Sequence, residues 1–113
     1  MAVRGAQKRI IGAVQAWNEV EVRPHRYGGL EFRLGKRELG HIHGDALVDI
    51  PFPKAVRNEI VAAGEAEPHH ILPNSGWVSL FLRDETDVDR AIALLERSFQ
   101  LALAHQKTAA AAK

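Results

Sequence analysis

The alternation of hydrophobic and polar positions predicts a helix at each end of the chain. Ile10, Val14 and Trp17 follow the spacing of one helical face, so we expect a helix over residues 4–18, with Trp17 in the core. A final helix should start at residues 84–87, where acidic side chains suit a first turn. Its apolar stripe consists of Val88, Ile92, Leu95, Phe99 and Leu103.

Between these helices, alternation with a period of two predicts strands. Residues 20–23 and 30–34 alternate in this way, and Gly35-Lys36 fits a two-residue hairpin turn that returns the chain through residues 37–43. Residues 46–50 form either a short strand or an extended turn. The best-defined strand covers residues 77–83, and both of its faces are largely apolar.

These elements predict one α+β domain over residues 1–105. A helix from Pro53 to Ala63 separates the early strands from the last one, which gives the order α-β-β-β-α-β-α. We expect a single antiparallel sheet of four to five strands, with helices packed mainly on one face. The Ala-rich tail, residues 106–113, has no core face, and we expect it to fray.

The hairpin register decides which way the central histidines point. A two-residue turn pairs Leu34 with Arg37, Phe32 with Leu39 and Leu30 with His41, and it places His43 opposite Gly28. This register puts His41 and His43 on the core side of the sheet. It leaves Glu31, Arg33 and Glu38 on a solvated face. A one-residue slip would reverse both assignments.

Two polar clusters along the chain are the candidate functional residues. The first, ELGHIHGDALVDIPF at residues 38–52, carries His41 and His43 two positions apart, so both imidazoles share one strand face. The second, HHILPNSGW at residues 69–77, begins with His69 and His70 and ends at Trp77. We expect the two clusters to meet and to line a pocket.

Composition excludes several classes of protein. The chain of 113 residues has no cysteine, which rules out disulfides and thiolate chemistry, and a net charge of +1 argues against nucleic acid as a partner. No apolar run approaches the length of a membrane span, and no signal peptide is visible. We therefore expect a cytoplasmic protein, monomeric or homodimeric, that binds a small molecule and neither nucleic acid nor membrane.

Several sequence strings together resemble a known family. The strings are RPH at residues 23–25, GLEFRLG at 29–35, GHIHG at 40–44, DIPFP at 49–53, HH at 69–70 and PNSGWVS at 73–79. As a set they resemble a small bacterial family of luciferase-like domains of unknown function, whose relatives include the luciferases of bioluminescent fungi. The resemblance runs from Val20 to Phe99. The second half of the chain also looks like the YjbR/MmcQ type of small α+β domain.

The resemblance implies an enzyme that oxidises a planar phenolic or pyranone-type substrate. The fungal relatives oxidise a hydroxylated pyranone with molecular oxygen and without a bound cofactor, so no cofactor is expected here. We do not expect light emission. The fungal proteins also carry a membrane-anchoring segment that we do not expect in this chain.

The residue types are compatible with that chemistry. A histidine near neutral pKa can deprotonate a phenol or enol, so His41 and His43 are candidates for the base and its neighbour. The remaining candidate catalytic residues are His69 and His70, which could orient the substrate, and Asp49 (or Asp45), which could fix an imidazole tautomer. Candidate substrate-binding residues are His25, Glu31, Arg33, Ser75, Trp77 and Ser79, with Trp77 suited to stacking on a flat ring.

Three alternatives remain open from the sequence. A His-x-His strand can supply two ligands to zinc, copper or iron, with a third from His69, His70 or Asp49; His41, His43 and His70 are one such set. The pocket could instead belong to a binding module without enzymatic activity. The histidines could also serve only as hydrogen-bonded parts of the fold.

Overall fold

The structure is a computed structural model that describes residues 2–25 and 28–111. In chain order the helices are α1 (Ala6–Gln15), α2 (Lys54–Ala62) and α3 (Glu85–Ala111). The strands are β1 (Val20–Pro24), β2 (Leu30–Leu34), β3 (Arg37–His43), β4 (Leu47–Pro51), β5 (Glu67–Pro68) and β6 (Trp77–Phe81).

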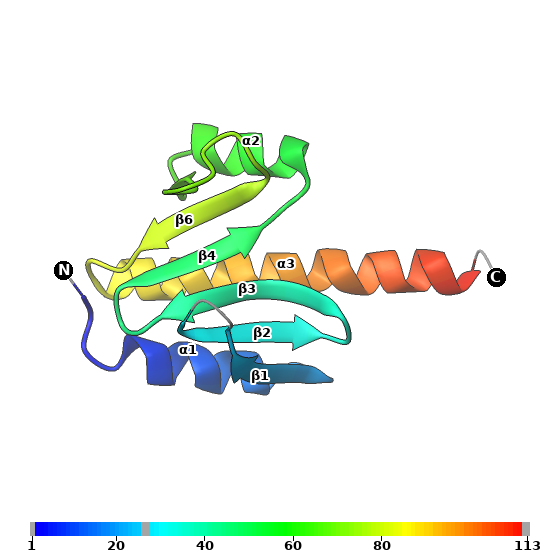
Figure 1. The fold of residues 1–113 in the computed structure, drawn as a ribbon, viewed down its shortest axis with the longest axis horizontal. Coiled ribbons are helices and arrows are strands. Elements are labelled where there is room, and N and C mark those ends of the chain that lie inside the picture. Colours follow the sequence, from blue (N-terminus) through cyan, green and yellow to red (C-terminus); the bar gives the residue numbers. More distant parts are fainter. Residues whose placement is uncertain (1, 26–27, 112–113) are drawn as a thin grey trace.

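All six strands form one antiparallel sheet in the order β1-β2-β3-β4-β6-β5. Helices α1 and α3 lie behind one face of the sheet, and α2 lies at its β6 end (Figure 1). The predicted α+β class, with one antiparallel sheet, is confirmed. The opposite face of β2, β3 and β4 carries no helix, and this uncovered face is where the functional candidates gather.

The sheet has more strands than the sequence pattern predicts. Residues 47–51 form β4, which settles the choice between a strand and an extended turn, and Glu67–Pro68 pairs with β6 inside a segment expected to be loop. The expected count of four to five strands and the expected element order are therefore corrected. The element order is α-β-β-β-β-α-β-β-α.

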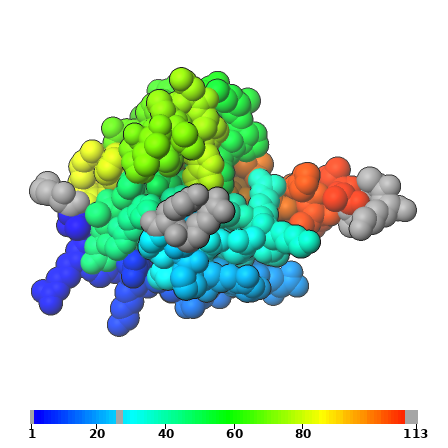
Figure 2. Space-filling view, viewed as in Figure 1, coloured from blue at the N-terminus to red at the C-terminus, as the bar shows by residue number. Residues whose placement is uncertain are grey.

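Helix α3 extends beyond the sheet and includes most of the Ala-rich tail. It runs to Ala111, and its orange and red C-terminal part projects from the body of the molecule in Figure 2. The fraying expected for residues 106–113 stays a prediction. Within residues 2–25 and 28–111, no helix combines the length and the hydrophobicity that a membrane crossing requires.

Alternation along the strands divides their side chains between a core face and an open face. The side chains toward α1 and α3 include Phe32, Leu39, Ile42, Val48, Ile50 and Val78, all fully buried. The intervening positions on the open face include four polar residues, Glu31, His41, Asp49 and Ser79. Each of these four residues is nevertheless less than 9 % exposed, so the open face carries a buried polar layer.

The predicted hairpin register is correct at the turn and wrong beyond it. Leu34 pairs with Arg37 as expected, but a β-bulge follows, so that His41 lies opposite Glu31 and not opposite Leu30. The expected pairing of Phe32 with Leu39 is also replaced, because Phe32 lies opposite Gly40. The bulge adds one residue to β3 and turns His41 and His43 away from the helices. Their expected placement on the core side is therefore wrong.

Close packing of β3 against its neighbours explains the bulge at Gly40. A Cβ atom on Gly40 would lie 2.9 Å from the Asp49 carbonyl oxygen and 2.7 Å from Cδ2 of Leu95, and the residue has a positive φ of 157°. Only glycine fits this approach without displacing a neighbour. The carbonyl of Leu39, at the bulge, accepts a hydrogen bond of 2.9 Å from the buried Ser98 hydroxyl of α3.

Candidate functional site

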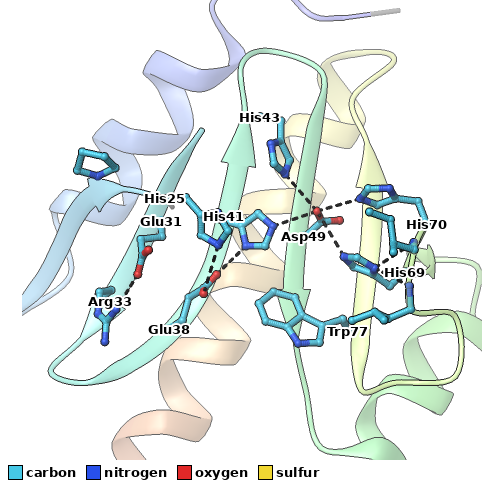
Figure 3. A pocket seen from close by; sticks show the side chains of 13 residues that line it. His25, Glu31, Arg33, Glu38, His41, His43, Asp49, His69, His70 and Trp77 are labelled. Atoms are coloured by element: carbon cyan, nitrogen blue, oxygen red, sulfur yellow. Dashed lines mark hydrogen bonds and ion pairs between the residues drawn. The ribbon is translucent and has the colours of Figure 1, made fainter. Parts of the chain in front are cut away.

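A cavity of about 800 Å³ opens on the uncovered face of the sheet, within the size range of small-molecule sites. Strands β2, β3 and β4 form its floor, and residues 69–72 and Trp77 form one wall. Five of the six histidines line it, together with the carboxylates of Glu31, Glu38 and Asp49. Figure 3 shows His41, His43, His69 and His70 pointing toward Asp49 from β3 and from the segment that follows β5.

The carboxylate of Asp49 is the centre of this arrangement. Its side chain is 1 % exposed, and its Oδ1 accepts a hydrogen bond of 2.7 Å from the Ser79 hydroxyl. Its Oδ2 lies 3.1–3.6 Å from the Nε2 atoms of four imidazoles, those of His41, His43, His69 and His70 (Figure 3). Burial raises the pKa of Asp49, but the hydrogen bonds from His41 and Ser79 outweigh it and lower the pKa to about 2.

His41 bridges two carboxylates. Its Nδ1 lies 2.7 Å from Oε2 of Glu38, and its Nε2 lies 3.1 Å from Oδ2 of Asp49. Since both acceptors are carboxylates, both ring nitrogens carry protons and His41 is an imidazolium cation. Burial alone lowers its pKa, but the bonds to Asp49 and Glu38 dominate and raise it to about 9. His41 is therefore not a free base at neutral pH.

His69 is held in one tautomer by its own loop. Its Nδ1 accepts hydrogen bonds from the backbone N–H groups of Ile71, at 3.2 Å, and Leu72, at 3.0 Å. The proton of the neutral ring must then be on Nε2, which faces Asp49. Burial lowers the pKa of His69, and the neighbouring His70 and His41 act in the same direction. His69 thus anchors residues 69–72 over the cavity as a neutral side chain.

His43 and His70 are the two more exposed imidazoles of the Asp49 cluster. Their side chains are 33 % and 34 % exposed, and no hydrogen bond from the described residues engages Nδ1 of either ring. Burial and the nearby cation of His41 lower the pKa of His43. The backbone N–H of His70 donates to the Ser79 hydroxyl, so that one serine positions both Asp49 and His70.

The β2 end of the cavity is closed by an ion pair. Arg33 donates to Glu31 at 2.8 Å and to the Lys36 carbonyl at 2.7 Å. Glu31 is 8 % exposed, so the expectation that Glu31 and Arg33 form a solvated face is wrong, and the same bulge explains why. His25 stacks on His41 with ring centroids 4.2 Å apart.

Aromatic and aliphatic side chains complete the walls. The Trp77 ring lies 5.2 Å from that of His41 and 6.0 Å from that of His69, centroid to centroid. Ile71 and Leu72, 70 % and 54 % exposed, stand at the cavity mouth. The cavity therefore combines a polar floor with a partly apolar wall, the composition typical of sites for organic ligands.

Some of the candidates from the sequence lie outside the cavity. Asp45 caps α1, accepting hydrogen bonds from the backbone N–H groups of Gly5 and Gln7. Ser75 closes its own turn by donating to the Leu72 carbonyl. Ser79 lies fully buried beneath Asp49. The other candidates, His25, Glu31, Arg33, His41, His43, Asp49, His69, His70 and Trp77, all line the cavity.

Glu38 lines the cavity, although the sequence placed it on a solvated face and did not mark it as a candidate site residue. It reaches His41 because the bulge adds a residue between them, so that positions 38 and 41 point to the same side. The signal that could have identified it is Gly40 in the middle of a predicted strand, since an isolated glycine there often marks a bulge.

The donor atoms form three overlapping groups that could hold a metal ion. The ligand atoms of His41, His43 and Asp49 lie within 4.8 Å of one another, and so do those of Asp49, His69 and His70. His25, Glu38 and His41 form a further set within the same limit. The cluster could therefore hold a metal ion, whereas the set of His41, His43 and His70 expected from the sequence is divided between two groups.

Comparison with known proteins identifies the family. A model of the family described as "Luciferase domain" matches residues 36–98, which include β3, β4, β6 and the Asp49 cluster. No curated protein matches the chain at the threshold applied. No solved structure matches it either. Because the family model covers more than half of the 113 residues, this chain belongs to the Luciferase domain family.

Proposed function

We propose that this protein is a small-molecule oxidase or oxygenase that acts on a planar phenolic or pyranone-type substrate in the histidine-lined cavity. The observation that carries the proposal is the convergence of four imidazoles on Asp49 inside a cavity large enough for such a ligand and walled by Trp77. Membership of the Luciferase domain family supports the same reaction class.

The cavity suits the binding of a flat ring that carries an acidic hydroxyl group. The Trp77 ring offers a planar surface beside the floor, and exposed Ile71 and Leu72 offer apolar contact at the mouth. Among the polar groups of the cavity, the imidazoles of His43 and His70 have Nδ1 atoms that can accept a proton from a phenol or an enol.

We take His70 as the base in preference to the equally exposed His43, because burial and the nearby His41 cation lower the pKa of His43. Both nitrogens of His41 are bonded to carboxylates, and Nδ1 of His69 is bonded to its own loop. One third of the His70 side chain is exposed to solvent, and its Nε2 lies 3.3 Å from Oδ2 of Asp49. Its Nδ1 can accept a proton. Asp49 would hold the ring in that tautomer, and Ser79 would hold both Asp49 and the His70 backbone.

The reaction would proceed by removal of the substrate's hydroxyl proton to the imidazole, followed by reaction of the electron-rich anion with molecular oxygen. In the oxygenase form, a carbon of the anion forms a bond to oxygen, the two electrons of that bond come from the substrate, and the proton returns to give a hydroperoxide. In the oxidase form, two electrons and two protons pass to oxygen and hydrogen peroxide is released.

Oxygen uptake tests the proposal. The untagged protein is mixed with a panel of 4-hydroxy-2-pyranones and catechols in an oxygen electrode, and products formed under ¹⁸O₂ are analysed by mass spectrometry. We expect uptake with at least one compound, abolished by His70→Ala and retained by His105→Ala, a remote exposed control. Tight binding of a panel compound without oxygen uptake would refute the enzymatic proposal in favour of a binding module.

A further inference from the structure

We propose that His41, His43 and Asp49 bind a divalent first-row transition-metal ion, with coordination positions left open toward the cavity. Metal binding can be measured without any substrate, so this inference stands apart from the oxidation reaction. It rests on the positions of three ligand atoms and on the side chains that support them.

The separations between the Asp49 oxygen and the two histidine nitrogens match those between neighbouring ligands of a bound ion. Oδ2 of Asp49 lies 3.1 Å from Nε2 of His41 and 3.4 Å from Nε2 of His43. For metal–ligand bonds of about 2.1 Å, neighbouring ligands are roughly 3.0 Å apart in octahedral and roughly 3.4 Å apart in tetrahedral geometry. All three atoms lie within 4.8 Å of one another, so small side-chain rotations suffice to enclose an ion.

Strand pairing holds these three residues together. His41 and Asp49 are direct partners across the β3–β4 ladder, and His43 lies two positions along β3 on the same face. The Asp49 backbone is fully buried, with β3 on one side and β6 on the other. The three donors are thus carried by the sheet, which is a rigid support for a metal site.

Supporting hydrogen bonds are also in place. Histidine ligands usually donate their second ring N–H to a carboxylate, and His41 donates Nδ1–H to Glu38 at 2.7 Å. The Ser79 hydroxyl binds Oδ1 of Asp49 at 2.7 Å, so the ion would bind Oδ2, which faces the four imidazoles in the metal-free protein. Upon binding, the ion takes the place of the Nε2 proton of His41, and that proton leaves to solvent.

The competing group, Asp49 with His69 and His70, is less suitable. Nδ1 of His69 accepts two backbone N–H groups, so its Nε2 carries the proton and has no lone pair for a metal. Ligation by His69 would break both loop contacts. Without His69, only His70 and Asp49 would remain in this group as ligands of the ion. The geometry therefore favours the His41 side of Asp49 over the His69 side.

The donor set indicates the class of metal. Two imidazole nitrogens and one carboxylate oxygen suit iron(II), cobalt(II) or zinc(II), and the same combination with open positions is the ligand set of non-haem iron oxygenases. Calcium and magnesium prefer sites made of oxygen ligands. We therefore expect binding of Zn²⁺ and Co²⁺ but not of Mg²⁺.

Calorimetric titration of the untagged protein, freed of metal by dialysis against chelator, tests the assignment. ZnCl₂ and CoCl₂ should each bind at one site per chain, and MgCl₂ should not bind. His43→Ala and Asp49→Asn should weaken Co²⁺ binding by about 100-fold or more, and Glu38→Gln by roughly 10–100-fold. His70→Ala and His105→Ala are matched controls, because each removes an imidazole outside the set, and both should change affinity less than about threefold.

Two outcomes would overturn the proposal. One is the absence of Zn²⁺ and Co²⁺ binding by the folded wild-type protein. The other is loss of binding in His70→Ala with retention in His43→Ala, which would move the site to the other side of Asp49. Circular dichroism of each metal-free variant checks folding. Because one third of the His43 side chain is exposed to solvent, His43→Gln provides a second variant if the alanine variant does not fold.

Discussion

Raising the pH should remove a defined part of the folding stability by deprotonating His41. In the folded, metal-free protein, burial lowers the pKa of His41, but the hydrogen bonds to Asp49 and Glu38 outweigh burial. The pKa therefore rises from 6.5 to about 9. A group whose pKa is higher in the folded state than in the unfolded state stabilises the fold. This stabilisation is complete at pH values below the unfolded-state pKa, and it is lost as the pH rises through the folded-state pKa. The interval from 6.5 to about 9 corresponds to roughly 3 kcal/mol.

Urea unfolding in the presence of chelator, at several pH values between about 6.5 and 10, measures this contribution. His41→Gln is the reference variant, because glutamine at this position keeps hydrogen-bonding groups and cannot titrate. The free-energy difference between wild type and variant should shrink by about 3 kcal/mol over this range. A difference that stays constant from pH 6.5 to 10 would refute the assignment of His41 as a cation between two carboxylates.

Three further predictions concern the floor, the bulge and the wall of the cavity. Asp49→Asn should lower the free energy of unfolding at pH 7 by about 3 kcal/mol in urea denaturation, because it leaves a buried cation with one carboxylate partner fewer; an unchanged stability would contradict this. Gly40→Ala should cost about 1–3 kcal/mol because its Cβ meets the Asp49 carbonyl, whereas Gly12→Ala, with no atom within 4 Å, should not destabilise α1 in the same measurement. Trp77→Ala should weaken binding of a planar phenol by about 10-fold in calorimetry while leaving Co²⁺ affinity intact; equal loss of both would indicate collapse of the cavity.

Local sequence patterns were sufficient to predict most of the fold. Period-two alternation identified β1 and β2, the hairpin turn at Gly35-Lys36 identified β3, and a largely apolar run identified β6. The apolar stripes identified α1 and α3, because each of these helices buries one face. Strand β5 was missed because two residues carry no periodicity. Its pairing with β6 depends on the path of the preceding loop, which no local pattern encodes.

The direction of the central histidines could not be predicted in the same way. The turn at Gly35-Lys36 defines the register only as far as Arg33 and Glu38, and the bulge then shifts every later pair. The bulge lies beside Gly40, where a Cβ atom would collide with Asp49 of β4 and Leu95 of α3, and these residues are far away in the sequence. Register is sensitive to one residue, so an undetected bulge reversed the predicted face of His41.

The grouping of the candidates around one carboxylate also required the structure. Sequence spacing suggested that the two histidine clusters meet, but not that four Nε2 atoms share Oδ2 of Asp49. The alternative carboxylate, Asp45, is closer to His41 and His43 in the sequence and instead caps a helix. The two carboxylates differ in their positions relative to the strands. Asp49 lies in β4 and faces His41 across the β3–β4 ladder, whereas Asp45 lies in the turn before β4.

The central claim is that Asp49 gathers four imidazoles in one cavity, and ¹⁵N-edited NMR of the histidine side chains tests it most directly. In the metal-free protein at pH 7, both ring nitrogens of His41 should be protonated and His69 should be the Nε2–H tautomer. Asp49→Asn should shift the ring signals of His41, His43, His69 and His70 and leave those of His105 unchanged. Shifts confined to a single histidine, in a variant that remains folded, would contradict the account.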